Sequence, residues 1–197
     1  MPSRRPPGLR RSSPLPAPAL PPREAAGPGL QDRPDAKDLS AALQAAAKRK
    51  GGRQDHGLDV DRCVAGLQRG VSRVAPEDLA GSVWALAKLR RQDSAAVGNL
   101  LRSSLARISS FGHSDLARLA WAAAKLGVRE HAVVQALGEE VLRRGGGLSP
   151  QGLSNVAWAF AKIGGARAEL LPALSRSALR KLGESSPQAL SNLAWAF

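Results

Sequence analysis

Tryptophan recurs in this chain at a constant interval of 37 residues, at Trp84, Trp121, Trp158 and Trp195. The first three are each followed by Ala-x-Ala-Lys and then by Leu or Ile. A period of this size is characteristic of repeat proteins, in which units too small to bury their apolar faces alone stack on their neighbours. The interval therefore predicts a stack of small repeated units.

Each unit begins with a helical pattern. Apolar residues in 116–123 and again in 153–160 recur at i, i+3, i+4 and i+7, which places them on one face of a helix. Ser-Pro pairs at 149–150 and 186–187 are typical of an N-cap followed by proline at the first helical position. These features predict where the first helix of each repeat begins and which face it buries.

A second helix follows in each unit. Gly127 and Gly164 predict the end of the first helix, whereas Arg90 holds the equivalent place in the first regular unit, where a different turn is expected. Leucines at the same interval mark a second buried face: Leu100, Leu137 and Leu174, then Leu105, Leu142 and Leu179. The fold class predicted is all-α, an α-solenoid of stacked helical hairpins.

The chain divides into three parts. Residues 1–34 contain ten of the fourteen prolines and are expected to be disordered. Residues 35–74 read as a degenerate N-terminal capping repeat with Gln44 in the Trp position. A longer linker that includes the glycines at 51–52 would lead to its second helix, expected over 58–74. Residues 75–197 form three and a half regular repeats, so we expect the array to be truncated here and to continue in a longer protein.

The N-terminal segment has two interpretations. It is rich in Arg and Ser and has no acidic residue before Glu24, which resembles an organellar transit peptide. Its prolines would interrupt the amphipathic helix that mitochondrial transit peptides usually form. Two interpretations of residues 1–34 therefore remain. The segment targets the protein to a mitochondrion or plastid, or it is a plain disordered tail on a cytoplasmic protein.

The chain is basic throughout. Its net charge is +13, of which residues 1–34 carry +4, residues 35–74 +3 and residues 75–197 +6. A basic repeat array favours a polyanionic partner, with nucleic acid first, although Arg is also simply common in a chain of this composition. No apolar run approaches the roughly 20 residues of a membrane span.

Enzymatic and metal chemistry have no pattern to support them. The only cysteine, Cys63, has no partner for an internal disulfide, and the histidines share no spacing: His56, His113 and His131. No nucleophile–base pair, carboxylate pair or phosphate-binding loop recurs. We therefore expect no enzyme, no cofactor, no metal and no small-molecule substrate.

The repeated Trp can serve packing or binding. It stands five residues after a stripe leucine, about 140° around the helix, so it has a contact away from its own hairpin partner. Alanines surround it, which favours packing between successive repeats. The alternative is an exposed Trp on which RNA bases stack.

The residues around each Trp are the candidate RNA-binding positions. Four residues after it stands a lysine, at Lys88, Lys125 and Lys162, and three residues before it the side chain varies, with Gly81, Arg118, Asn155 and Asn192. Both positions share one side of the helix with the Trp. The lysine would meet phosphate and the variable residue a base edge. The alternative is that each lysine covers the Trp ring and solvates that face.

The segment 153–164, together with the period, resembles octotricopeptide and heptatricopeptide repeats of organellar RNA-binding proteins, which often end in a RAP domain. It also resembles the leucine-rich region of FAST kinase-like proteins. This resemblance implies single-stranded RNA binding in support of processing, stability, translation or ribosome assembly, with ribonucleoprotein or ribosomal proteins as further partners. The alternative function is a protein–protein scaffold without direct RNA contact.

Overall fold

The structure, a computed structural model, describes residues 35–49, 59–91, 95–164 and 167–197. The described residues are predominantly helical and contain no β-strand, as the all-α prediction requires. The segment 1–34 and the expected glycine linker at 51–52 lie outside the described residues.

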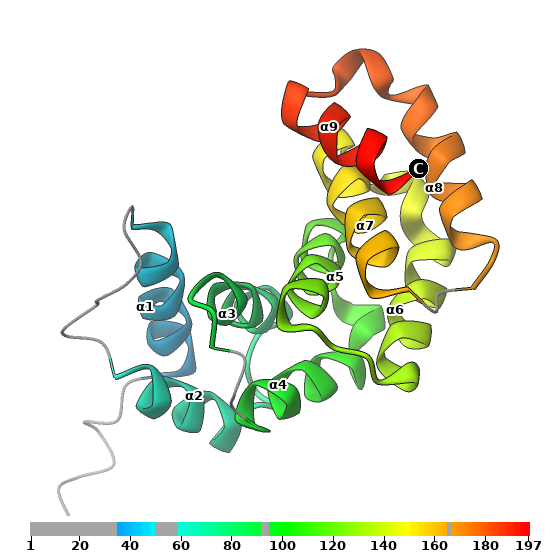
Figure 1. Ribbon diagram of the computed structural model, residues 1–197. Coiled ribbons are helices and arrows are strands. Elements are labelled where there is room, and N and C mark those ends of the chain that lie inside the picture. The colour runs from blue at the N-terminus through cyan, green and yellow to red at the C-terminus, as the bar shows by residue number, and fades with distance from the viewer. Residues whose placement is uncertain (1–34, 50–58, 92–94, 165–166) are drawn as a thin grey trace, which may run out of the picture. The chain divides into compact units, whose positions relative to one another are not determined.

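The described ranges contain nine α-helices: α1 (Ala36–Lys48), α2 (Val60–Arg69), α3 (Pro76–Lys88), α4 (Ala95–Leu105), α5 (His113–Leu126), α6 (His131–Arg144), α7 (Pro150–Ile163), α8 (Leu170–Arg180) and α9 (Pro187–Ala196) (Figure 1). Three short 3-10 turns follow α4, α6 and α8, at Ile108–Ser110, Gly145–Gly147 and Leu182–Glu184. These turns are also 37 residues apart, so the repeat extends to the connections between units.

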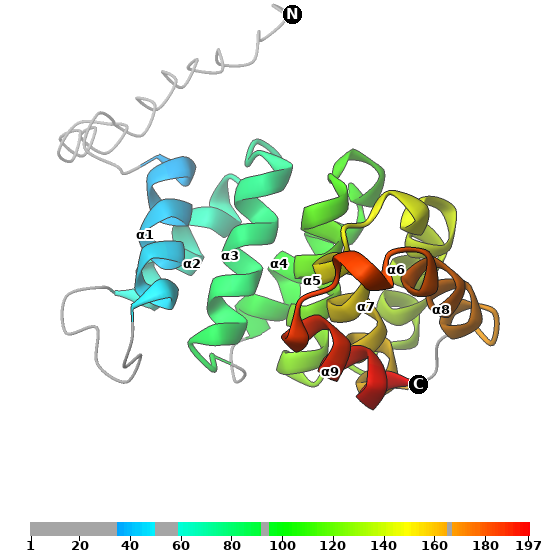
Figure 2. The same cartoon turned by 90° about the horizontal axis from the view of Figure 1, so that it is seen from above.

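The helices lie in two rows. In one row α1, α3, α5, α7 and α9 lie in chain order, each packed against the next odd-numbered helix (Figure 2). In the other row α2, α4, α6 and α8 pack on one another in the same order. Each of α1, α3, α5 and α7 also packs against the even-numbered helix that follows it, so every 37-residue unit contributes one helix to each row.

The predicted helix starts at the Ser-Pro pairs are confirmed. Ser149 and Ser186 are N-caps, and each is followed by proline at the first helical position. The Ser149 Oγ accepts a hydrogen bond from the Gly152 N–H at 3.1 Å, and the Ser186 Oγ accepts one from the Ala189 N–H at 3.2 Å. These bonds satisfy N–H groups that have no partner inside the helix.

The predicted helix ends at glycine are also confirmed. Gly127 and Gly164 cap α5 and α7 with φ values of 71° and 72°, in the half of conformational space that glycine adopts without steric cost. The second helix of the N-terminal unit is shorter than the expected segment 58–74, because α2 ends at Arg69 and Gly70 follows as its C-cap.

The turn after α3 is the same as the turn after α5, contrary to expectation. Arg90 takes a left-handed φ of 57°, although it is not glycine. The Arg91 N–H donates to the Leu86 carbonyl at 3.0 Å, and Val128 makes the same bond to Ala123, 37 residues further on. The stacking of the helices therefore imposes one turn geometry on both units and leaves Arg90 strained by about 1–2 kcal/mol.

The interface between neighbouring odd-numbered helices is built from small side chains. The alanine that follows each of the first three tryptophans is fully buried: Ala85, Ala122 and Ala159. The leucines of the predicted stripe are buried as well: Leu79, Leu116 and Leu153. Methyl groups at the contact allow the helix axes to approach closely, so that one continuous core runs through the row.

Burial of the second set of predicted leucines is confirmed at the first repeated position, whereas burial varies at the second. Leu100, Leu137 and Leu174 are buried, and Leu105 and Leu142 pack against the core. Leu179 was expected to be equivalent, but 66% of it is exposed. It lies on α8, the last helix of its row in the described chain, where no further even-numbered helix covers it.

Candidate nucleic-acid interface

The row of odd-numbered helices brings the four tryptophans together in a ladder. The rings of Trp84 and Trp121 lie 6.4 Å apart between centroids, tilted by 40°, and those of Trp158 and Trp195 lie 6.1 Å apart, tilted by 39°. Trp84, Trp121 and Trp158 are half-buried, whereas Trp195 is 60% exposed. The rings therefore contact one another across repeats and still reach the surface.

Lysine links the ladder where the two tryptophan pairs meet. The Lys125 Nζ lies 5.4 Å from the Trp121 ring centroid and 5.2 Å from that of Trp158, so one cation contacts two aromatic faces. Lys88 lies over Trp84 and Lys162 lies over Trp158, each at 5.0 Å. These distances are within the range of cation–π interactions, each worth about 0.5–1 kcal/mol at an exposed site.

The three predicted lysines are thus placed on the rings of the ladder. Their side chains are exposed, and their stems cover part of each indole. This is the ring-covering arrangement weighed as the alternative to phosphate contact. We call the four tryptophans together with Lys88, Lys125 and Lys162 the Trp–Lys ladder. Because the ammonium groups remain at the surface, they give this ladder its positive charge.

The variable positions lie one turn earlier on the same helices, with arginine on α5 and asparagine on both α7 and α9. Arg118 is exposed and its Nη1 is 3.4 Å from Asp115. Asn155 and Asn192 each accept a hydrogen bond from a glutamine one turn earlier: Gln151 Nε2 donates at 3.1 Å and Gln188 Nε2 at 3.0 Å. Both glutamines lie near a helix start, where capping would explain them, and glutamine and asparagine four residues apart are a known helical pair.

The first variable position, Gly81, is covered by another part of the protein. Gly81 is buried, and the side chain of Gln44 lies so close to it that a Cβ there would collide with the amide group. Gln44 is the residue that replaces Trp in the N-terminal unit. The ladder and its row of variable side chains therefore begin at α3 and α5 rather than at α1.

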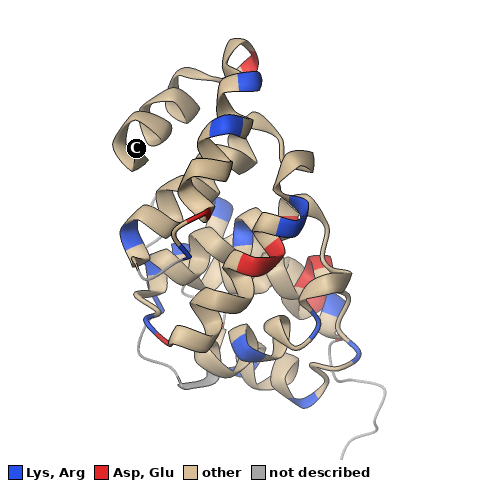
Figure 3. Ribbon diagram, turned by 90° about the vertical axis from the view of Figure 1, so that its right-hand side faces the viewer, with Lys and Arg blue, Asp and Glu red and all other residues tan. Residues whose placement is uncertain are grey.

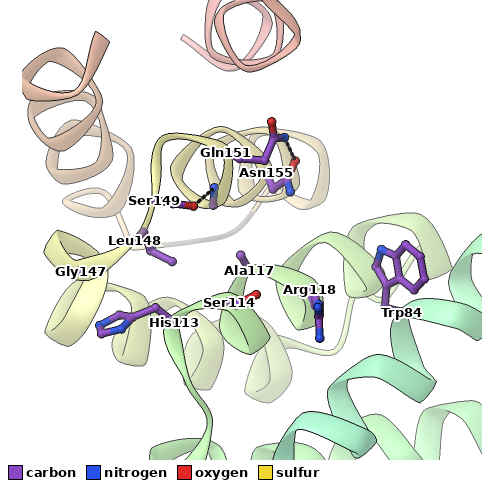
Figure 4. A pocket seen from close by; sticks show the side chains of 11 residues that line it. Trp84, His113, Ser114, Ala117, Arg118, Gly147, Leu148, Ser149, Gln151 and Asn155 are labelled. Atoms are coloured by element: carbon purple, nitrogen blue, oxygen red, sulfur yellow. Dashed lines mark hydrogen bonds between the residues drawn. The ribbon is translucent and has the colours of Figure 1, made fainter. Parts of the chain in front are cut away.

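A pocket of about 440 Å³ lies beside the first open positions. Trp84 from α3, Arg118 from α5, and Gln151 and Asn155 from α7 line it (Figure 4). At its other end His113 lies against the backbone of the loop before α7. We call this the α5–α7 pocket. It brings together two of the predicted variable residues, while the three predicted lysines lie outside it.

Asp115 is the acidic neighbour of this pocket. Burial raises the pKa of its carboxyl group, against the lowering effect of Arg118 and of the hydrogen bond that the Gly112 N–H donates to it. Arg118 is therefore held by a single long contact to a partly desolvated carboxylate. An exposed ion pair of this kind contributes about 0–1 kcal/mol, so the guanidinium can turn to another anion at little cost.

A second ladder of cations has a structural role that the sequence analysis missed. Arg107, Arg144 and Lys181 are 37 residues apart, and each donates to backbone carbonyls of the preceding unit. The acceptors also repeat: Val74 at 2.9 Å, Phe111 at 2.8 Å and Leu148 at 2.6 Å. A cation at a constant period was the signal that could have revealed them. These three cations link successive units through backbone carbonyls.

Arg144 is further fixed by Glu140. The Glu140 side chain is buried on α6, and its carboxylate is 2.5 Å from Arg143 Nη2 and 2.6 Å from Arg144 Nε. The hydrogen bonds from Arg143, followed by the nearby charge of Arg144, lower the pKa of Glu140 despite its burial. Glu140 is therefore a carboxylate at neutral pH.

The even-numbered row carries paired charges. Ion pairs link Arg91 to Asp61, Arg102 to Glu130 and Arg167 to Glu139, at 2.5, 2.7 and 3.8 Å. Lys and Arg are distributed over many helices rather than gathered on one (Figure 3). Across the described part of the chain, many basic residues are thus already engaged, and the Trp–Lys ladder is the surface where cations and aromatic rings alternate.

The residues that the structure describes include no group of three or more His, Cys, Asp and Glu that could hold a metal ion. Cys63 is buried, and burial raises the pKa of its thiol, which disfavours the reactive thiolate. Among the helices described, none combines the length and the apolar character needed to cross a bilayer.

Comparison with known proteins does not assign a family. No protein-family model matches the chain, and no curated protein sequence matches it significantly. The resemblance to octotricopeptide and heptatricopeptide repeats and to FAST kinase-like proteins stays a prediction from the segment 153–164 and the 37-residue period.

Proposed function

We propose that this protein is an α-solenoid that binds single-stranded RNA along the surface of α3, α5, α7 and α9. The observation that carries the proposal is the Trp–Lys ladder, in which half-buried rings alternate with exposed ammonium groups across successive units. Aromatic faces and backbone-neutralising cations are the two elements that proteins combine to hold single strands.

The charge and the variable positions support the same function. The net charge of +13 favours a polyanion, and counterion release would supply much of the affinity. Arg118, Asn155 and Asn192 lie one turn from the ladder and present a guanidinium in one unit and an amide in each of the next two. In an organelle such binding would serve RNA processing, stability, translation or ribosome assembly, alongside ribonucleoprotein or ribosomal proteins.

The test is an anisotropy titration of the full 197-residue chain with fluorescein-labelled single-stranded RNA at several salt concentrations. We expect affinity to fall steeply with salt. Changing Lys88, Lys125 and Lys162 together to alanine should weaken binding and reduce the slope of log K against log salt by about 2, because each phosphate contact contributes about 0.7 for a single strand.

The matched control removes three exposed cations from the other row: Arg69, Arg176 and Arg180. Both triple variants lose the same formal charge, so only a surface-specific contact makes them differ. Equal weakening by the two variants would reduce the interaction to non-specific charge attraction. If the unchanged protein binds no RNA even at low salt, the proposal is wrong.

A protein scaffold is the second candidate. One observation favours it: the lysine stems and indoles form a partly apolar surface, and Trp195 is 60% exposed at one end of the ladder. An acidic segment of a partner protein could bind there by the same charges. Affinity capture with and without RNase separates the candidates, because partners that survive digestion and depend on the three lysines favour the scaffold.

A further inference from the structure

The α5–α7 pocket is assembled from three consecutive repeats. Trp84 comes from α3, Arg118 from α5, and the Gln151–Asn155 pair from α7 (Figure 4). In repeat terms, these are the ladder residue of one unit and the variable residues of the next two. One unit therefore does not form a binding position by itself, and the pocket volume of about 440 Å³ is in the range of small-ligand sites.

The amide pair gives the pocket a defined hydrogen-bonding character. Gln151 Nε2 donates to Asn155 Oδ1 at 3.1 Å, so this oxygen is engaged. The Asn155 amide nitrogen then presents two N–H donors, for which the described residues provide no acceptor. Within this amide pair the Asn155 NH2 group is thus the available donor, whereas the Gln151 Oε1 accepts from the Ser186 hydroxyl at 3.5 Å.

The remaining lining supplies the other contacts that a nucleotide needs. Trp84 brings a half-buried indole to the lining, although Lys88 lies over its ring and Trp121 contacts it, and Arg118 offers a guanidinium held only by the 3.4 Å contact to Asp115. A phosphate is a stronger bidentate partner for a guanidinium than a single long contact to a carboxylate. An indole, a guanidinium and an amide donor therefore line one nucleotide-sized space.

We propose that the α5–α7 pocket holds one nucleotide of single-stranded RNA and prefers uracil to cytosine. Arg118 contacts the phosphate, the Trp84 indole packs against the base, and the Asn155 amide donates to the keto oxygen at position 4. Cytosine carries an amino group at that position, which would oppose donor to donor. This inference rests on the proposed function and adds to it the base that one site selects.

The neighbouring units bound the site and extend it. Toward the N-terminus, Gln44 lies over Gly81, so the equivalent position is filled by protein. Toward the C-terminus, Gln188 and Asn192 on α9 repeat the same donor pair at 3.0 Å. The same amide pair therefore recurs one unit further along the row.

The experiment compares 12-nucleotide oligo(U) and oligo(C), which have equal length and charge, by anisotropy with the full chain. We expect oligo(U) to bind about five-fold tighter or more, as one additional hydrogen bond allows. Asn155→Ala should remove most of this ratio. Asn155→Asp should reverse it, because a carboxylate accepts from the cytosine amino group.

The controls separate base selection from folding and from RNA binding in general. Asn99 on α4 lies in the other row and also takes part in a side-chain hydrogen bond, so Asn99→Asp should leave the ratio unchanged. Circular dichroism melting checks that each variant is folded. If the Asn155→Asp variant is not folded, Gln151→Glu serves as the second variant.

Two results overturn the inference while the proposed function survives. One is equal affinity of the unchanged protein for oligo(U) and oligo(C). The other is a folded Asn155→Asp or Gln151→Glu variant that binds RNA with the ratio of the unchanged protein. Failure of the unchanged protein to bind either oligonucleotide at low salt would instead overturn the proposed function, and this inference with it.

Discussion

Lys125 reaches past its own repeat to the ring of Trp158, and its Nζ lies 5.2 Å from the centroid of that ring. The same ammonium group lies 5.4 Å from the Trp121 ring, so a single cation joins α5 to α7 at the surface. Lys88 and Lys162 each lie over one ring only. The chemically equivalent lysines of successive repeats are therefore not energetically equivalent.

We predict that Lys125→Ala lowers the free energy of unfolding by about 1–1.5 kcal/mol, and that Lys88→Ala lowers it by about half as much. The reason is the number of aromatic faces that each cation contacts. Urea unfolding followed by circular dichroism measures the difference. Lys125→Arg should retain most of the stability, since a guanidinium also stacks on indole; equal losses for the two alanine variants would contradict the bridging role.

The second prediction concerns the cations that donate to backbone carbonyls of the preceding unit. Arg144→Met should destabilise the protein by about 2–3 kcal/mol, because it removes the bond to the Phe111 carbonyl at 2.8 Å and leaves the buried Glu140 with less compensation. Arg143→Met removes an exposed cation that also contacts Glu140, and we expect it to cost under about 1 kcal/mol. Similar losses in urea unfolding for both variants would argue against the carbonyl bonds.

The third prediction is a dependence of stability on pH that originates at Glu140. Its pKa is lowered in the folded protein, so its contribution is present above the unfolded-state pKa and is lost as pH falls through the folded-state pKa. Glu140→Gln should therefore flatten the acid limb of a plot of unfolding free energy against pH. An unchanged acid limb in this variant would show that Glu140 is not its origin.

Asp115 acts in the opposite direction and needs its own variant. Burial raises its pKa in the folded protein, so its contribution is fully present below the unfolded-state pKa and is lost as pH rises through the folded-state pKa. Asp115→Asn should remove this loss, and the measurement is the same series of unfolding curves. The two variants are expected to change the pH profile with opposite signs.

The fourth prediction is a stabilising substitution. Arg90 has a φ of 57°, which costs an L-residue about 1–2 kcal/mol, whereas glycine adopts it freely. Arg90→Gly should raise the free energy of unfolding by about 0.5–1 kcal/mol after the greater flexibility of glycine in the unfolded chain is included. Arg90→Ala, which removes the side chain but retains the Cβ, should give no such gain in thermal melting.

Local features of the fold could be predicted because their causes are local. Ser149 and Ser186 cap helices through N–H groups three residues away, and Gly127 and Gly164 end helices through their own φ values. The leucine and alanine stripes were readable for the same reason, because helical periodicity alone puts them on one face. The left-handed turn at Arg90 could not be predicted in this way, since stacking with the neighbouring unit imposed a glycine-like turn on it.

The candidate site could be predicted only as a set of positions. The period identified Lys125, Arg118 and Asn155, but not that Lys125 contacts the ring of the next unit, nor that Arg118 and Asn155 share a pocket with Trp84. The position of Gln151 near a helix start favours capping, and only the structure shows that its side chain pairs with Asn155.

The repeat length, the helical class and the limits of several helices follow from the amino-acid sequence alone, because each depends on residues within one turn or one period. Which cations hold the units together and which remain at the surface depends instead on how the helices pack. Arg144 and Lys125 look alike in the sequence, as basic residues in a repeating unit. They differ because one reaches carbonyls and the other reaches aromatic rings that belong to different repeats, and only the packing of the two rows brings those partners within contact distance.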